Sequence, residues 1–262
     1  MNNDINSPFR GLGGFRFGGM VLEIATFNIQ SAILAAQSGA NRIELCENPT
    51  DGGTTPSYGT LKTVRGKINI PVFPIIRPRG GDFLYSNEEF EIMKQDILLC
   101  KNLGFEGVVL GLLNADGTVN TQRTSILVEL AYPLEVTFHR AFDRAVNPLQ
   151  AMEDIIVCGC QRILTSGQTP NAFDGKELIN QLVLQADERI IIMPGSGVRS
   201  NNIFEIANYT GAKELHSSAR KMIVSEMLFI QNNMQEKLEN MMVDVEEIKK
   251  MTEALNMVKI AD

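Results

Sequence analysis

The chain reads Gly39-Ala40-Asn41-Arg42-Ile43-Glu44-Leu45-Cys46 at a point where a helix is expected to end and a strand to begin. A glycine at such a junction permits the left-handed conformation in which many helices end. Three further junctions have the same design, at Gly104-Phe105-Glu106, Gly159-Cys160-Gln161 and Gly211-Ala212-Lys213. The sequence therefore predicts a repeated helix–strand unit.

Eight short runs rich in β-branched residues fit this unit. We place the strands near residues 21–26, 42–47, 71–77, 107–113, 134–140, 162–166, 189–194 and 213–218. Helical stretches between them, at a spacing of roughly 30 residues, predict an α/β fold that closes into a (β/α)8 TIM barrel of about 250 residues. A doubly wound open sheet is the alternative.

Composition limits the class of protein. A chain of 262 residues that is 44% hydrophobic can form one large α/β domain. Its net charge of −7 argues against binding to nucleic acid, which requires a basic face. We also expect no membrane association, because no apolar run approaches the roughly 20 residues that cross a bilayer. Four scattered cysteines indicate reduced thiols and a cytoplasmic location.

The two ends of the chain depart from the repeat. Residues 1–19 mix glycine with phenylalanine and arginine and lack an apolar signal core, so we expect a tag or a disordered N-terminal extension before a single domain over residues 20–262. Beyond residue 219, the apolar residues are spaced as on one face of a helix, at Ile223, Met227, Ile230, Met234, Leu238 and Met241. This stripe predicts additional C-terminal helices with a methionine-rich packing face, with thioether capture of copper as the less favoured alternative.

The stretch from Ile75 to Phe83 carries the clearest chemical signal. In an extended segment, Arg77 and Arg79 project to the same side, and two forked guanidinium groups suit a phosphate or a carboxylate. Glycines and hydroxyls at the ends of the sixth and seventh strands can direct backbone N–H groups at the same anion. The predicted anion site thus contains Arg77, Arg79, Ser166, Gly167, Gly195, Ser196 and Gly197. Structural ion pairs and tight turns are the alternatives.

Alternation of side chains along the strands predicts a polar barrel interior. Glu44 and Cys46 share the face opposite Ile43 and Leu45. The same count directs further polar side chains inward, at Glu23, Arg77, Thr137, His139, Glu214 and His216. A structural ion-pair layer is one interpretation of this set.

The other interpretation is catalytic. His139 is then a general acid or base that Asp143 or Glu44 orients. We expect Asp143 and a bound anion to favour the protonated form of His139.

Several long motifs resemble those of the CutC family. They are Glu44-Leu45-Cys46, Gly52 to Ser57, Ile76 to Phe83, Val136 to Asp143, Arg162 to Gln168 and Ile192 to Val198. The resemblance runs from about Met20 to Ala219, with one departure, Gly-Gly-Thr-Thr-Pro at 52–56 where the family usually has Gly-Gly-Leu-Thr-Pro. It implies a TIM barrel, a cytoplasmic location, homo-oligomers and a role in copper homeostasis.

Three functions follow from these observations. The first is weak Cu(I) binding at Cys46 with His216 as second ligand, because Cu(I) prefers sulfur and imidazole. We expect Cys158 and Cys160 to lie at the opposite end of the barrel. The second is an enzyme that acts by acid–base chemistry on a small phosphorylated or carboxylated metabolite, and the third is a non-catalytic binding barrel.

Overall fold

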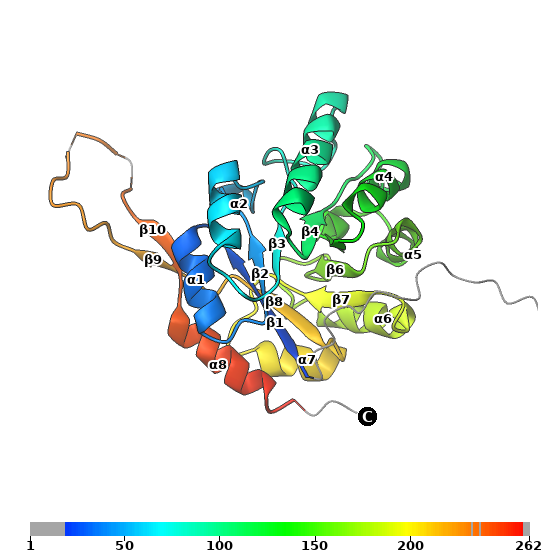
Figure 1. Ribbon diagram of the computed structural model, residues 1–262. Coiled ribbons are helices and arrows are strands. Elements are labelled where there is room, and N and C mark those ends of the chain that lie inside the picture. The colour runs from blue at the N-terminus through cyan, green and yellow to red at the C-terminus, as the bar shows by residue number, and fades with distance from the viewer. Residues whose placement is uncertain (1–18, 232, 236, 259–262) are drawn as a thin grey trace, which may run out of the picture.

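The computed structural model describes residues 19–231, 233–235 and 237–258, and it forms a barrel of parallel strands surrounded by helices (Figure 1). The predicted extension at residues 1–19 falls almost entirely on residues 1–18, which lie outside the described residues. The barrel strands are β1 (Val21–Thr26), β2 (Arg42–Leu45), β3 (Val72–Pro74), β4 (Gly107–Leu110), β5 (Glu135–Phe138), β6 (Arg162–Thr165), β7 (Ile191–Pro194) and β8 (Glu214–Ser217). Each lies within a predicted strand.

The helices follow the strands in alternation. They are α1 (Ile29–Gln37), α2 (Tyr58–Arg65), α3 (Asn87–Leu103), α4 (Thr121–Ala131), α5 (Pro148–Cys158), α6 (Lys176–Ala186), α7 (Ile203–Thr210) and α8 (Val245–Leu255). Short 3-10 turns occupy Pro49–Asp51 and Arg140–Arg144. At the predicted junctions, Gly104, Gly159 and Gly211 each adopt a positive φ and cap the preceding helix.

The strands close into a ring. Two four-stranded parallel sheets have the orders β3-β2-β1-β8 and β4-β5-β6-β7. A parallel bridge between Ile75 and Val109 joins the two sheets on one side, where the Ile76 N–H donates to the Val109 carbonyl at 2.7 Å. On the other side β7 lies against β8. The TIM-barrel prediction is confirmed, and the open-sheet alternative is wrong.

The hydrophobic core lies between the strands and the helices. Ile43 and Leu45 of β2 are fully buried in it, as the alternation predicts. The opposite faces of the strands are directed into the barrel and carry its buried charged residues. Within the described residues, no helix combines the length and the apolar character needed to cross a bilayer.

The chain after β8 differs from the prediction. Instead of a long helix, β9 (Arg220–Ile223) and β10 (Asn240–Val243) pair antiparallel, and the segment between them projects from the barrel (Figure 1). The predicted helical stripe from Ile223 to Met241 is therefore wrong, and α8 is the helix that follows it. Apolar spacing stabilises a helix only where the stripe is buried against a partner, and here Leu228 and Met227 are 103% and 60% exposed.

Candidate functional site

A cavity of about 1030 Å³ opens at the C-terminal ends of the barrel strands, where TIM barrels carry their active sites. Both halves of the barrel contribute to its lining. From one half come Glu44, Arg77 and His216, and from the other come His139, Asp143, Ser196 and Gly197. Polar residues deeper in the barrel support this lining.

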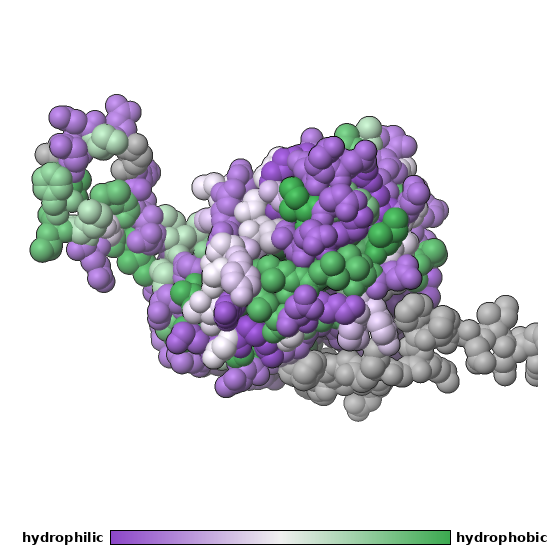
Figure 2. All heavy atoms as spheres, turned by 45° about the horizontal axis from the view of Figure 1, so that its top comes forward, coloured by the Kyte–Doolittle hydropathy of each residue, from purple (hydrophilic) through white to green (hydrophobic). Residues whose placement is uncertain are grey.

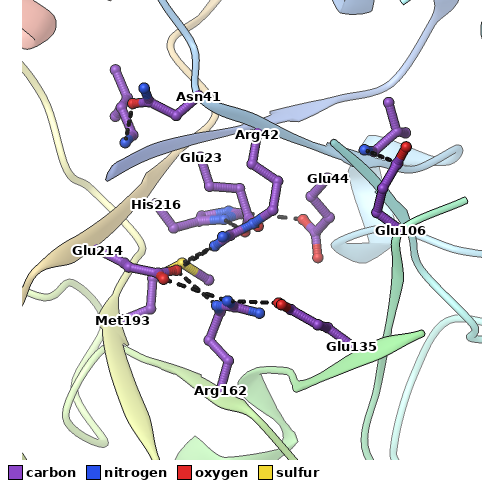
Figure 3. A network of polar contacts seen from close by, with 12 residues as sticks. Glu23, Asn41, Arg42, Glu44, Glu106, Glu135, Arg162, Met193, Glu214 and His216 are labelled. Carbon is purple, nitrogen blue, oxygen red and sulfur yellow. Dashed lines mark hydrogen bonds and ion pairs between the residues drawn. The ribbon is translucent and has the colours of Figure 1, made fainter. Parts of the chain in front are cut away.

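The deepest layer is an ion-pair network across the barrel (Figure 3). Arg42 bonds to Glu23 and to Glu214, the latter at 2.6 Å. Arg162 bonds to Glu214 at 2.7 Å and to Glu135 at 3.0 Å. Because a lone charge in this interior would be costly, the network satisfies the charges in a fixed geometry. The interpretation of the inward polar residues as a structural ion-pair layer therefore holds for Arg42, Arg162 and their partners.

Above it, Glu23, His216 and Glu44 form an acid–base cluster (Figure 3). Strand register sets their order, because Glu23 on β1 is the partner of His216 on β8. The His216 Nδ1 lies 2.8 Å from Glu23 Oε1, and its Nε2 lies 3.8 Å from Glu44 Oε2. Only Glu44 and His216 of these three line the cavity. Glu23 therefore acts on the cavity through His216.

The cluster is tuned to hold protons near neutral pH. Burial raises the pKa of Glu44 from its ordinary 4.5 to about 7, although the charge of His216 opposes this. Burial works to lower the pKa of His216, but the bond to Glu23 and the charge of Glu44 raise it above its ordinary value. Burial also disfavours ionised Glu23, yet Arg42 and His216 hold its pKa well below 4.5. Glu44 can therefore gain or lose a proton near neutrality while Glu23 stays ionised.

His139, at the end of β5, is a neutral hydrogen-bond donor. Its Nδ1 accepts the Ala141 N–H at 3.2 Å, which places the remaining ring proton on Nε2. That Nε2 is buried and has no hydrogen-bond partner among the described residues. Burial, together with the charge of Arg77, lowers the pKa of His139 from 6.5 to about 3. Burial and Arg77 thus outweigh any effect of Asp143 on the pKa of His139, and the expected effect of a bound anion stays a prediction.

Asp143 does not orient His139 in the way we predicted. Its carboxylate accepts bonds from Thr165 Oγ1 at 2.5 Å, the Ser166 N–H at 3.0 Å and Arg140 Nε at 2.8 Å. These contacts fix the loop after β6 to the turn after β5. Asp143 thus shapes the rim of the cavity.

Arg77 carries a buried positive charge at the cavity wall. Its Nη1 donates to the carbonyls of Asp51 and Gly53 at 2.5 and 2.8 Å, and its Nη2 donates to that of Gly81 at 2.8 Å. The guanidinium lies 5.1 Å from the centre of the Phe83 ring. None of the ion pairs in the described part of the chain involves Arg77, and its Nε has no hydrogen-bond partner there. The charge is therefore available to an anion.

The remaining predicted anion-site residues divide into two groups. Ser196 and Gly197 line the cavity as predicted, whereas Arg79, Ser166, Gly167 and Gly195 do not belong to the described lining. Arg79 points away and pairs with Asp82 and Glu89 at 2.9 and 2.5 Å. Ser166 Oγ bonds to the Thr169 carbonyl and Asp143, so it serves the loop.

Residues 20–221 match the family model described as the CutC family. The chain belongs to the CutC family. A CutC family protein from Chromobacterium violaceum is 52% identical over 209 residues, covering 80% of this chain and 85% of that protein. The mouse protein named copper homeostasis protein cutC homolog is 47% identical over 211 residues, covering 80% and 78%. A solved CutC structure from Streptococcus agalactiae has a TM-score of 0.73 at 32% identity, covering 76% of this chain and 98% of its own.

The family name suggests copper, but the residues predicted to hold it do not fit a metal site. Cys46 packs with Phe73, Ile75 and Val109 and does not belong to the described cavity lining. Burial and the nearby Glu44 raise the pKa of its thiol well above the ordinary value, which disfavours the thiolate that binds metals. Within the described residues, no group of three or more His, Cys, Asp or Glu side chains is placed to hold a metal ion. Copper binding at Cys46 and His216 stays a prediction.

Several residues at the site escaped the sequence analysis. Alternation was not applied to Arg42 and Arg162, although Arg42 lies two residues before Glu44 and hence on its face. Arg199, in the loop after β7, and Arg220, the first residue of β9, also line the cavity, at positions that alternation within the barrel strands does not predict. No motif in the sequence marked Arg199 or Arg220 as a cavity residue.

Proposed function

We propose that this protein is an enzyme that moves a proton on a small carbonyl compound bearing a phosphate or carboxylate group. One observation carries the proposal: two buried donor groups without partners among the described residues, Arg77 Nε and His139 Nε2, belong to side chains lining the same cavity. An unsatisfied buried donor is costly, and a ligand that accepts hydrogen bonds removes the cost.

The anionic group of the substrate is assigned to Arg77. Its guanidinium is already oriented by three backbone carbonyls, so little side-chain entropy is lost on binding. Across the barrel mouth, Ser196, Gly197 and Arg199 offer a second polar wall. Because β3 and β7 are four positions apart in a ring of eight strands, these walls face one another and leave room between them for a small molecule.

The reaction follows from the protonation states. Glu44, with a pKa of about 7, removes a proton from the carbon next to the carbonyl. The electron pair of the broken C–H bond moves into an enolate, whose oxygen accepts a hydrogen bond from neutral His139. Where the carbon that loses the proton carries a hydroxyl group, the hydroxyl proton passes to the enolate oxygen, and return of the first proton from Glu44 to the former carbonyl carbon completes an isomerisation. His216, held by Glu23, stabilises ionised Glu44 before the transfer.

The reaction is supported by the positions of the proposed acid–base and binding residues around the cavity. Glu44, Arg77 and His139 reach the cavity from β2 and from the ends of β3 and β5, strands whose C-terminal ends meet at one mouth. An ion-pair layer accounts for Arg42, Arg162 and Glu214, but among the described residues the one ion pair of Glu44 is the contact of 3.8 Å with His216. A carboxyl group beside a cavity with a pKa near 7 is typical of an acid–base residue.

Binding is tested by thermal stabilisation with inorganic phosphate and a panel of phosphorylated and carboxylated carbonyl compounds. A ligand at about 100 times its Kd should raise the Tm of the parent by roughly 5–10 °C. Arg77→Met should lose this increase, whereas Arg79→Met, outside the cavity lining, should keep it. The increase is compared with and without ligand for each variant, so a lower starting Tm of Arg77→Met does not affect the result.

Two outcomes would contradict the proposal. One is that no compound stabilises the parent, or that Arg77→Met responds as the parent does. The other is stabilisation by Cu(I) alone that Cys46→Ser abolishes and Cys158→Ser retains, which would favour the copper function predicted from the family resemblance. Compounds that do stabilise the parent are then screened for turnover, which separates an enzyme from a binding protein.

A further inference from the structure

Two arginines stand at the cavity mouth, after β7 and β8, without carboxylate partners in the described part of the chain. Arg199 and Arg220 both line the cavity, and the Arg199 Nη2 donates to the Arg220 carbonyl at 3.2 Å, which joins the two loops. Among the described lining residues, five are arginines and four are Asp or Glu, although the whole chain has a net charge of −7. Positive charge is therefore concentrated at the mouth, where it attracts anions.

The turn before Arg199 adds backbone donors to this wall. The N–H groups of Ser196, Gly197 and Val198 donate to no acceptor among the residues that the structure describes, and all three residues line the cavity. Ser196 and Gly197 have φ angles of 79° and 68°, and successive N–H groups in such turns form concave sites for anions. The Ala172 N–H and Asn202 Nδ2 hold the turn by donating to the Ser196 and Gly197 carbonyls, each at 2.9 Å.

The base of the β9–β10 hairpin fixes Arg220 at the mouth. Arg220 pairs with Val243, which belongs to the hydrophobic core, and the Asp244 N–H donates to the Ala219 carbonyl at 2.6 Å. The segment between the two strands stands apart from the body of the barrel (Figure 2). The base of the hairpin is thus the part that reaches the cavity, and it presents the Arg220 side chain from a fixed backbone.

This wall lies opposite Arg77. Four positions separate β3 from β7 in the ring of eight strands. Strands about 4.8 Å apart and tilted by about 36° enclose a ring roughly 15 Å across. The Arg77 guanidinium is held on its own side by the carbonyls of Asp51, Gly53 and Gly81. A molecule with an anionic group at each end can contact both walls, whereas one phosphate bonded to Arg77 leaves the far wall without a ligand.

We propose that the substrate carries two anionic groups, one at Arg77 and the other, a phosphate, at a second subsite. The N–H groups of residues 196–198, with Arg199 and Arg220, form this second subsite. The inference rests on the proposed function, because it assigns the far end of the same substrate. Several donors that converge on one group suit the three terminal oxygens of a phosphate better than the two oxygens of a carboxylate.

The two subsites would place the middle of the substrate at the acid–base residues. Around the ring from β3 to β7, one path passes β2, β1 and β8, and the other passes β4, β5 and β6. Glu44 is on β2 and His139 follows β5, and both side chains line the cavity. A molecule that spans the two subsites therefore passes between the base and the neutral donor of the proposed reaction. Binding at both ends would orient the reacting carbon.

Alkanediphosphonates of increasing chain length test the second subsite, because they carry two anionic groups and no carbonyl. Calorimetric titration compares each one with the alkylphosphonate of the same length. The parent should bind the best-fitting diphosphonate at least about 100-fold more tightly than its monoanionic counterpart, since the second group binds at a high effective concentration. The double variant Arg199→Met, Arg220→Met should lose this preference and still bind the alkylphosphonate through Arg77. Arg189→Met is the matched control, because Arg189 precedes β7 at the other end of the barrel.

The outcomes separate this inference from the proposed function. Equal binding of diphosphonate and alkylphosphonate by the parent, with both lost in Arg77→Met, would overturn the second subsite and leave the proposed function in place. A preference that survives in the double variant would also overturn it. Arg220→Met alone, at an exposed position, should lose part of the preference and replaces the double variant if that does not fold. Alkanedicarboxylates that bind as tightly as the diphosphonates would overturn the assignment of phosphate. Binding of no phosphonate at all would contradict the proposed function as well.

Discussion

Replacing Glu44 with glutamine removes a buried carboxyl group whose pKa the fold raises from 4.5 to about 7. A raised pKa for an acid means that the folded protein retains a proton that the unfolded chain releases. Between about pH 4.5 and 7 the folded state therefore binds more protons than the unfolded state, and the free energy of unfolding falls as pH rises. Glutamine keeps the shape of the protonated acid and does not titrate, so this decline should disappear from the variant.

The magnitude follows from the two pKa values. Between pH 5 and pH 8 ionisation of Glu44 should cost the parent about 2–3 kcal/mol of unfolding free energy that Glu44→Gln does not lose. His216 acts in the same direction. Its raised pKa contributes stability that is lost as pH rises, and removing the charge of Glu44 reduces that contribution. The stability of the variant relative to the parent should thus increase steadily across this range.

Denaturant unfolding of both proteins at pH 5, 6, 7 and 8 measures the difference. Glu253→Gln, at an exposed position on α8, is the control for loss of a carboxylate. A difference between parent and Glu44→Gln that stays constant from pH 5 to pH 8 would refute the reasoning. It would show that Glu44 is ionised throughout this range, as on the protein surface, and would remove it as an acid–base residue.

Two further predictions concern the histidines and the ion-pair network. The chain has only two histidines, so NMR can follow both imidazoles. We expect His216 to titrate above pH 6.5, while His139 stays neutral down to about pH 4. Protonation of His139 near pH 6.5 would contradict its role as a neutral donor. Glu214→Gln should cost about 3–5 kcal/mol of unfolding free energy, because it leaves Arg42 and Arg162 incompletely paired in the interior. Denaturant unfolding against the exposed control Glu205→Gln measures this, and a loss no larger than that of the control would show that the network contributes little.

The barrel was predictable from the sequence because its signals are local. Each strand alternates or is apolar throughout, and glycine ends the helices that precede β4, β6 and β8. The same alternation correctly directed Glu23, Glu44 and His216 inward. What it does not determine is the partner of each side chain, because Glu23 contacts His216 from 193 residues away.

The failures share a physical cause. Alternation places Arg77 and Arg79 on one side only while the backbone stays extended, but β3 ends at Pro74 and the chain bends after Arg77, which turns Arg79 to the surface. The stripe from Ile223 to Met241 has helical spacing, yet spacing alone does not supply the surface against which a helix would bury it. The protonation state of His139 depends on burial and on Arg77, neither of which is visible in its own strand.

The proposed reaction is tested most directly by exchange of substrate hydrogen for deuterium. Compounds that stabilise the parent are incubated with it in D2O, and proton NMR follows the C–H signal next to the carbonyl. The signal should decay at least about 100-fold faster with the parent than with Glu44→Gln, the usual contribution of a general base. Decay that is equally fast with Glu44→Gln, or no faster with the parent than without protein, would contradict proton abstraction by Glu44.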